Sequence, residues 1–157
     1  RGQNCPLAAE LFATTQDVYL LLGEYAENPD DHDTANGRAV TIDAACDRLA
    51  RMLCCDSSEI SKPELKEIAS QIASSQRRTI GEAVRRVLGR HSTKCEKIII
   101  SGSGEFLAEA VIRDIAEISS VEVTRLSTVL SSDVAQAACA FAVAQLAHER
   151  LGGIFLL

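Results

Sequence analysis

Apolar residues recur at helical spacing through much of residues 1–93, and polar stretches separate the periodic segments. The first apolar run, residues 18–22, follows a capping pattern at residues 14–17 and precedes Gly23. A Ser or Thr followed three residues later by an acidic residue is typical of a helix start, and glycine commonly follows a helix end. This pattern predicts a short buried helix that stops at Gly23.

Two further helices are predicted in the same part of the chain. Thr41 precedes a periodic apolar face that reaches Leu53, and its hydroxyl can cap the first turn. Residues 61–64 form a capping box, after which apolar residues recur as far as Leu88, with Gly89 as the stop. Between the first two helices, residues 24–40 lack this periodicity and are rich in turn-forming residues, which predicts a long loop.

The pattern changes after Thr93 from helices alone to strands and helices. The expected order is a strand at 97–101, a glycine turn at 102–104, a helix at 105–118, a strand at 121–126 and a helix from Ser132 or Asp133 to Arg150. We therefore predict a helix-rich α/β protein. Residues 1–93 would form a helical segment with the long loop, and residues 94–157 a strand-helix-strand-helix part.

Composition supports a globular, mainly helical chain. Of the 157 residues 46% are hydrophobic, 24% are charged and only 4% are aromatic, which excludes disorder and favours closely packed helices. The net charge is -6, and the arginines of residues 77–90 share their helical stretch with glutamates, so nucleic acid is not an expected partner. The apolar runs fall far short of the roughly 18 residues that a membrane-spanning helix needs.

The six cysteines and three histidines suggest no metal site. No C-x2-C pair is present and no histidine lies at metal-ligand spacing from a cysteine, so reduced core thiols in a cytoplasmic protein are expected instead of zinc or disulfides. No Ser or Cys lies in a nucleophile elbow, so nucleophilic hydrolysis finds no support. Because the chain opens on Arg1 and closes on the apolar run 154–157, we expect both ends to be cut.

The long loop carries the first candidate site. It contains an acidic cluster followed by an amide and an arginine, namely Asp30, Asp31, His32, Asp33, Asn36 and Arg38. Oxygen ligands of this kind can hold Mg2+ or a cationic amine, with Arg38 left to pair an anionic group. The spacing is not that of an EF-hand, and a solvated turn is the alternative interpretation.

The glycine turn carries the second candidate site, made of Gly102, Ser103, Gly104 and Glu105. Glycines between a strand and a helix let a ligand approach the backbone, and the helix start offers free N–H groups to a phosphate or ribose. Leu107 stands where a dinucleotide fingerprint has its third glycine, and the lysine of a P-loop is absent. An ordinary turn before a helix is the alternative.

Four blocks of sequence, residues 11–23, 33–38, 48–54 and 101–107, resemble one family. They are similar to the C-terminal half of hydantoinase/oxoprolinase-like proteins linked to tetrahydromethanopterin-dependent C1 transfer. Archaeal members of that family resemble the methanofuran-biosynthesis synthase that joins a furan methyl diphosphate to glutamyl-tyramine. The glycine turn is also shared with the wider superfamily of sugar kinases, actin and Hsp70.

The resemblance implies a fold of two ribonuclease-H-like lobes around a nucleotide or phosphate cleft. This chain would be a fragment of the C-terminal lobe with an inserted helical subdomain, and Gly102–Gly104 would be its adenosine-type loop. The catalytic residues and two phosphate loops would lie in a missing N-terminal lobe. Asn36 stands where relatives often carry Asp, which argues against an essential carboxylate at that position.

The expected function is therefore that of a lobe of a C1-metabolism enzyme acting on a phosphorylated or diphosphate small molecule. The resemblance implies a transferase that forms a C–N bond and releases diphosphate, with Mg2+ and either ATP or the diphosphate substrate as bound groups. The alternative is a non-catalytic nucleotide-binding or assembly module. The oligomeric state stays open, a homo-oligomer included.

Overall fold

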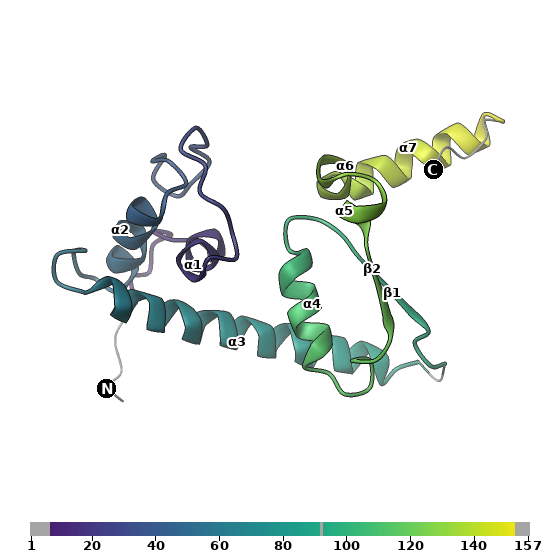
Figure 1. The fold of residues 1–157 in the computed structure, drawn as a ribbon, viewed down its shortest axis with the longest axis horizontal. Coiled ribbons are helices and arrows are strands. Elements are labelled where there is room, and N and C mark those ends of the chain that lie inside the picture. Colours follow the sequence, from purple (N-terminus) through teal and green to yellow (C-terminus); the bar gives the residue numbers. More distant parts are fainter. Residues whose placement is uncertain (1–6, 92, 153–157) are drawn as a thin grey trace. The chain divides into compact units, whose positions relative to one another are not determined.

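The structure is a computed structural model and describes residues 7–91 and 93–152. The elements in chain order (Figure 1) are α1 Thr15–Leu22, α2 Ile42–Met52, α3 Lys62–Leu88, β1 Lys97–Ile100, α4 Glu105–Arg113, β2 Glu122–Arg125, α5 Leu126–Val129, α6 Ser132–Gln136 and α7 Ala138–Arg150. Most of these elements are helices, and the two strands form one sheet. The helix-rich α/β class is therefore confirmed.

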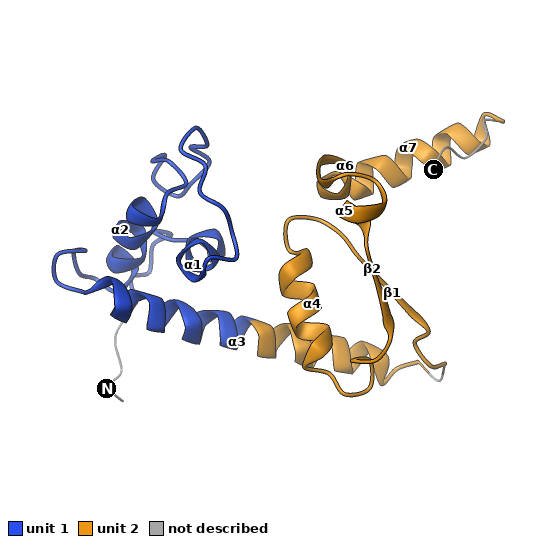
Figure 2. Cartoon of the chain, viewed as in Figure 1, with its two compact units in different colours: residues 1–76 blue, residues 77–157 orange. Residues whose placement is uncertain are grey.

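The chain forms two compact units, Arg1–Gln76 (unit 1) and Arg77–Leu157 (unit 2), which Figure 2 distinguishes by colour. The division falls within α3. The first part of α3 buries Leu65 and Ala69, while Ile80, Val84 and Leu88 pack against the hydrophobic core of unit 2. The helix thus contributes to both units, and the domain boundary expected at residues 93 and 94 stays a prediction.

Helix starts in unit 1 follow the capping residues. The backbone N–H of Thr14 donates to Asp17 Oδ2 at 2.9 Å, and α1 ends at Gly23, whose φ of 79° lies in the left-handed region. Thr41 Oγ1 accepts from the Ala44 N–H at 3.4 Å and caps α2. Both helices begin and end where the sequence predicts them.

The capping box before α3 is formed as well. Glu64 Oε2 accepts from both the N–H and the hydroxyl of Ser61, at 3.1 and 2.8 Å, and the Glu64 N–H lies 3.4 Å from Ser61 Oγ. Side-chain caps replace the hydrogen bonds that the first turn of a helix cannot make internally. The long helix therefore starts at its predicted position.

The core of unit 1 comes from α1, α2, the start of α3 and the end of the long loop. Its buried apolar residues are Val18, Tyr19, Leu20, Leu21, Val40, Ala44, Ala45, Cys46, Leu49, Ala50, Leu65, Ala69 and Ala73. Leu20, Leu49 and Val40 are at most 2% exposed. Tyr19 also donates its hydroxyl to Gln76 Oε1 at 2.7 Å, which ties α1 to α3 within the unit.

Unit 2 contains a parallel pair of strands joined through α4. Ile98 of β1 pairs with Val123 of β2, and Ile100 pairs with Arg125. Parallel strands need a crossover connection, usually a helix, and α4 supplies it. The hydrophobic core of the unit contains Ile100, Val111, Ile112, Ile115 and Ile118.

The predicted helix at 105–118 is too long, because α4 ends at Arg113. The chain then turns tightly: the Ile115 N–H donates to Ile112 O, and the Ile118 N–H donates to Ile115 O, both at 3.1 Å. Ile115 and Ile118 are 0% and 4% exposed. These tight turns bring both side chains into the core of unit 2, so burial overrides helix propensity here.

The predicted last helix is interrupted. It divides at Ala137 into α6 and α7, and the short helix α5, which the sequence did not predict, precedes them. Ala137 still donates to Asp133 O and accepts from the Phe141 N–H, so the break leaves these backbone groups bonded. Within the described part of the chain α7 buries none of its residues, so the close helix packing expected from composition does not extend to α7.

The burial of the cysteines tests the expectation that their thiols are reduced and lie in the core. Among the described residues the cysteines are free, but only Cys46 is buried, and Cys54 and Cys139 are exposed. The expectation of core thiols is therefore right for Cys46 and wrong for the two exposed ones; Cys5 and the apolar run 154–157 lie outside the described residues.

None of the described helices has the length and apolar character needed to cross a bilayer.

Candidate functional site

The predicted acidic loop is held by hydrogen bonds within itself. An isolated bridge pairs Asn28 with Val40 and closes its base. Inside the loop, Asp31 Oδ1 accepts from the Asp33 N–H at 2.9 Å, and Thr34 donates its hydroxyl to Arg38 O at 2.6 Å. The loop is thus an ordered turn structure whose acidic side chains lie at the surface.

Arg38 is paired within the protein. Its Nη1 donates to Asp47 Oδ2 of α2 at 2.5 Å, while the Arg38 side chain stays 56% exposed. A hydrogen bond from Ser57 and the bond from Arg38 together lower the pKa of Asp47. Asp47 therefore occupies one side of the Arg38 guanidinium, and the binding of an anion by Arg38 stays a prediction.

The buried side chain of Arg48 joins the loop to α2 through hydrogen bonds. Arg48 Nη1 lies 3.3 Å from Asn36 Oδ1 and 3.5 Å from Ala39 O, and its Nε and Nη2 donate to Asp17 Oδ1 at 2.8 and 2.6 Å. Asn36 Oδ1 also accepts from the Arg38 N–H at 3.2 Å. Asn36 therefore has a structural role, since its amide oxygen joins the loop to α2.

The described residues offer little to a metal ion on their own. They contain no group of three His, Cys, Asp or Glu side chains placed to hold one. Mg2+ commonly keeps several waters and binds through one or two carboxylates together with substrate phosphates. The exposed carboxylate of Asp33 and the half-buried one of Asp31 fit that partial role, and the described residues form no complete protein cage for Mg2+.

The glycine turn keeps its backbone accessible. Gly102 has φ 94°, and Gly104, the residue before α4, has φ -95° and ψ 13°. No heavy atom would lie within 4 Å of a Cβ at either glycine. Among the described residues the N–H groups of Ser103 and Gly104 have no hydrogen-bond acceptor. The turn therefore has the open backbone that the sequence predicts, and it lies in unit 2, whereas the acidic loop lies in unit 1.

Glu105 points into its own unit. Its side chain is buried, Oε1 accepts from the Ser127 N–H at 3.1 Å, and Oε2 accepts from the Ser127 hydroxyl at 2.5 Å. A carboxylate in the first turn of α4 also complements the positive end of the helix dipole. Both oxygens are thus used to tie α4 to the segment after β2, and ligand binding by Glu105 stays a prediction.

One cavity lies between α2 and the start of α3. It has a volume of about 310 Å³ and is lined by Asp43, Cys46, Asp47, Ser57, Ile60, Lys62 and Leu65. Its charged side chains are paired: Lys62 Nζ lies 2.7 Å from Asp43 Oδ1 within the lining, and Asp47 pairs with Arg38, which is not part of the lining. Burial raises the pKa of the Cys46 thiol, which disfavours the nucleophilic thiolate.

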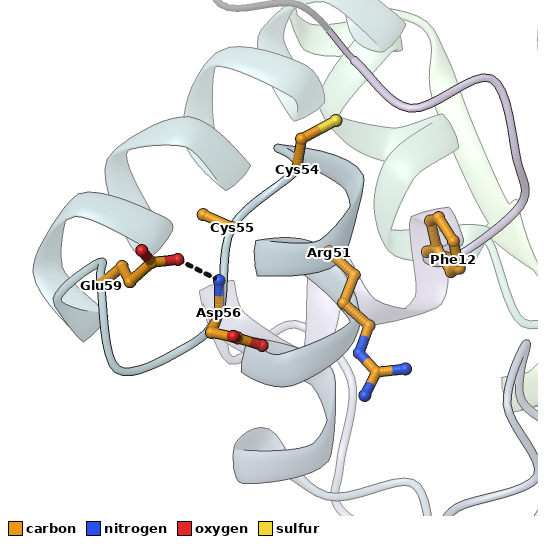
Figure 3. A pocket seen from close by; sticks show the side chains of 6 residues that line it. All are labelled: Phe12, Arg51, Cys54, Cys55, Asp56 and Glu59. Carbon is orange, nitrogen blue, oxygen red and sulfur yellow. Dashed lines mark hydrogen bonds between the residues drawn. The ribbon is translucent and has the colours of Figure 1, made fainter.

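A second cavity of about 270 Å³ lies at the end of α2 and is shown in Figure 3. The turn that shapes it is a helix stop of the Schellman type: the Cys55 N–H donates to Ala50 O at 3.2 Å and the Cys54 N–H to Arg51 O at 3.0 Å. Cys54 takes the left-handed position, with φ 57°, that glycine usually fills. Asp56 and Glu59 follow this turn and line the cavity together with Arg51.

The sequence of this chain is similar to those of known proteins. The sequence profile described as Hydantoinase/oxoprolinase matches residues 4–150. The chain belongs to the hydantoinase/oxoprolinase family. The resemblance inferred from the sequence blocks is confirmed at this level.

A curated relative adds a more specific similarity. The hydantoinase/oxoprolinase chain is 26% identical over 145 residues to the (4-{4-[2-(gamma-L-glutamylamino)ethyl]phenoxymethyl}furan-2-yl)methanamine synthase of Methanococcus vannielii. The aligned part covers 92% of this chain and 64% of the relative. The chain therefore spans less than two thirds of the length of this relative.

Sequence reasoning missed the features of this hydantoinase/oxoprolinase chain that depend on tertiary structure. Arg48 falls on the apolar face of α2 beside Ala45 and Leu49. An arginine on a buried face needs a partner for its charge, and this position is the one signal in the sequence that such a partner exists. Its partner Asp17 was recognised only as a capping residue. The cavity around Arg51 carried no motif that sequence analysis could find.

Proposed function

We propose that this chain belongs to an enzyme of methanofuran-type cofactor synthesis that joins a furan-methyl diphosphate to a γ-glutamyl-tyramine. The observation that carries the proposal is the similarity, over 92% of the chain, to the Methanococcus vannielii synthase. Family membership supports it, because the match to the hydantoinase/oxoprolinase profile covers residues 4–150. We place the activity in the cytoplasm and assign it to the complete protein.

The name of the relative's product bears on the type of bond formed. A phenoxymethyl group is an aryl ether, so in that compound the ring oxygen is bonded to the methylene carbon. We therefore propose C–O bond formation in place of the C–N bond expected from sequence. The phenolic oxygen would attack the methylene carbon, and the bond from that carbon to the diphosphate oxygen would break. Diphosphate would leave with the electron pair of that bond. The phenolic proton would pass to a base or to water.

The glycine turn is our proposed contact for the diphosphate. Its backbone is open at Gly102 and Gly104, and the amides of Ser103 and Gly104 have no acceptor among the described residues. Backbone N–H groups before a helix favour anionic oxygens. Mg2+ would enter with the diphosphate and would supply charge neutralisation. For unit 1 we propose separately that Asp31 or Asp33 of the acidic loop is a ligand of Mg2+. In this proposal β1, α4 and β2 belong to a ribonuclease-H-like lobe, and a second lobe supplies the catalytic groups.

The test uses the complete protein that contains this chain. Incubation with a furan-methyl diphosphate and γ-glutamyl-tyramine is expected to release diphosphate and to yield the ether, detected by mass spectrometry. The 157 residues alone are expected to show no turnover, because a cleft between two lobes loses its positioning when one is absent. ATP binding without any product would instead favour the alternative, a nucleotide-binding or assembly module. Turnover by the 157 residues alone would contradict the division of roles.

A further inference from the structure

The cavity at the end of α2 has no part in the proposed function so far. Its lining residues, drawn in Figure 3, are Phe12, Arg51, Cys54, Cys55, Asp56 and Glu59. They all come from unit 1. It combines an aromatic ring, a guanidinium and two carboxylates around one space of about 270 Å³.

The charges of this cavity are not matched as those of its neighbour are. Within the described residues the guanidinium of Arg51 makes no hydrogen bond or ion pair, although its charge acts on the Asp47 carboxylate of the neighbouring cavity, and Arg51 is exposed. Glu59 Oε2 accepts from the Asp56 N–H at 2.8 Å, while the Asp56 carboxylate has no donor there. In Figure 3 the Arg51 side chain extends between those of Asp56 and Phe12. The site thus presents a guanidinium that has no hydrogen-bond partner among the described residues, together with acidic oxygens.

An arrangement of this kind fits a zwitterion with an aromatic tail. A guanidinium binds a carboxylate through two parallel hydrogen bonds, and carboxylates accept from an ammonium group. A half-buried aromatic ring such as Phe12 adds an apolar face on which a second ring can pack. An α-amino-acid head group carries both charges on one carbon atom, so its carboxylate would bind the guanidinium while its ammonium binds the acidic oxygens.

We infer that this cavity binds the α-amino-acid head group of the γ-glutamyl substrate. Arg51 would hold the α-carboxylate, Asp56 and Glu59 the α-ammonium, and Phe12 the start of the tyramine portion. The inference rests on the proposed function for the identity of the compound, since a γ-glutamyl amide keeps both the α-carboxylate and the α-ammonium free. It assigns to unit 1 the selection of the phenolic substrate.

The test measures binding to the complete protein that contains this chain by titration calorimetry. The probes are γ-glutamyl-tyramine, tyramine, and γ-glutamyl-tyramine acetylated on its α-amine. We expect tyramine and the acetylated compound to bind at least about tenfold more weakly than γ-glutamyl-tyramine, because each lacks a charged contact. Equal affinity for tyramine, or no binding of γ-glutamyl-tyramine to the folded protein, would overturn the inference.

Variants identify the cavity as the place of binding. Arg51→Gln is expected to weaken γ-glutamyl-tyramine about tenfold and to leave tyramine unchanged, and Arg51→Lys to fall between, because lysine keeps the charge but not the paired geometry. Asp56→Asn combined with Glu59→Gln should weaken γ-glutamyl-tyramine but not its acetylated form. Arg86→Gln, an exposed arginine of α3, is the matched control and should change nothing. An unchanged affinity in Arg51→Gln, with circular dichroism showing a folded variant, would place the ligand elsewhere.

The inference and the proposed function fail in different ways. If the complete protein forms the ether and Arg51→Gln leaves its KM for γ-glutamyl-tyramine unchanged, the cavity inference is wrong and the proposed function stands. If γ-glutamyl-tyramine binds and Arg51→Gln weakens it, but no diphosphate is released from the furan compound, the proposed reaction is wrong and the cavity assignment stands.

Discussion

Asp17 and Arg48 form a fully buried ion pair between α1 and α2. Arg48 donates from Nε and Nη2 to Asp17 Oδ1 at 2.8 and 2.6 Å, and both side chains are only 1% exposed. The second carboxylate oxygen accepts from the Thr14 N–H at 2.9 Å. A buried charge is tolerated when it is paired and hydrogen-bonded, and here the pair also fixes the long loop, since Arg48 reaches Asn36 and Ala39.

The first prediction concerns the loss of one partner of this pair. Arg48→Met leaves the Asp17 carboxylate buried without its counter-charge, and we expect a loss of about 3–5 kcal/mol in the free energy of unfolding. Urea denaturation measures it. Hydrogen exchange should also become faster around Asn36 and Ala39, because their anchor is gone.

The control is the exposed pair of Arg38 and Asp47. Arg38→Gln should cost no more than about 1 kcal/mol, because surface ion pairs contribute little. The double variant Asp17→Leu with Arg48→Met should lose much less than the sum of its single variants, since no charge is then left unpaired. Additive losses in this cycle would contradict a direct interaction.

The second prediction concerns acid pH. The pKa of Asp47 is lowered by the Ser57 hydrogen bond and by Arg38. A carboxyl whose pKa is lower in the folded state adds stability above its unfolded pKa and loses it as the pH falls through the folded value. Asp47→Asn should therefore be less stable than the wild type by up to about 1 kcal/mol at neutral pH, and the difference should shrink below about pH 4.

The measurement is the free energy of unfolding of both proteins between neutral and acid pH. Asp30→Asn serves as the control, because its exposed carboxylate has no partner among the described residues and its curve should follow the wild type. A difference between Asp47→Asn and the wild type that persists unchanged in acid would show that the contribution of Asp47 is not ionic.

The third prediction tests Asp33 as a ligand residue. Its carboxylate is exposed and has no donor among the described residues, so Asp33→Ala should change stability by no more than about 0.5 kcal/mol. In the complete protein the same change should weaken Mg2+ binding, measured by titration calorimetry. Glu24→Ala, exposed at the start of the same loop, should change neither stability nor Mg2+ affinity. A large drop in Tm with unchanged Mg2+ affinity would make the loop purely structural.

The parts of the fold that could be predicted are those fixed by local interactions. Thr14, Thr41 and Ser61 start their helices through contacts within one turn, so the sequence alone reveals them. The end of α4 and the break at Ala137 could not be predicted. Neither is marked by Gly or Pro, and the first depends on the burial of Ile115 and Ile118 in a core assembled from distant segments.

Some features of the candidate sites could likewise be predicted from local sequence, and others depend on the fold. The openness of the glycine turn follows from Gly102 and Gly104 themselves, and was predictable from sequence. The pairing of Arg38 with Asp47 and the use of both Glu105 oxygens by Ser127 require knowledge of the fold, because Glu105 and Ser127 are 22 residues apart. Charged side chains that look free in a sequence are therefore the least reliable indicators of a ligand site.

The fourth prediction concerns Cys54, which fills a position that favours glycine. Its φ of 57° carries a steric cost for residues with a Cβ, on the order of 1 kcal/mol. Cys54→Gly should therefore raise the free energy of unfolding by up to about 1 kcal/mol, partly offset by the greater freedom of glycine in the unfolded chain. Cys55→Gly, next to it and without a left-handed φ, should lower the stability. A lower stability in Cys54→Gly would mean that the side chain has a packing role that outweighs its strain.

The last prediction separates binding from folding at the glycine turn. Gly102 has φ 94°, so Gly102→Val should destabilise the protein by about 1 kcal/mol or more. Gly104 has an ordinary φ of -95° and open space around its Cβ position, so Gly104→Val should cost less than about 1 kcal/mol. The two methyl groups of valine would nevertheless occupy the space through which a phosphate approaches the backbone.

Gly104→Val is thus the informative variant, and Ser103→Ala is its control, because removing a hydroxyl leaves the backbone N–H groups accessible. Diphosphate and ATP are titrated against the complete protein and both variants, with circular dichroism recorded on the same samples. We expect Gly104→Val to remain folded and to lose affinity by at least about tenfold, and Ser103→Ala to bind nearly as the wild type does. Because the loss would occur without unfolding, it would identify the backbone of the turn as the ligand contact; equal affinity in Gly104→Val would reduce the turn to a connection between β1 and α4.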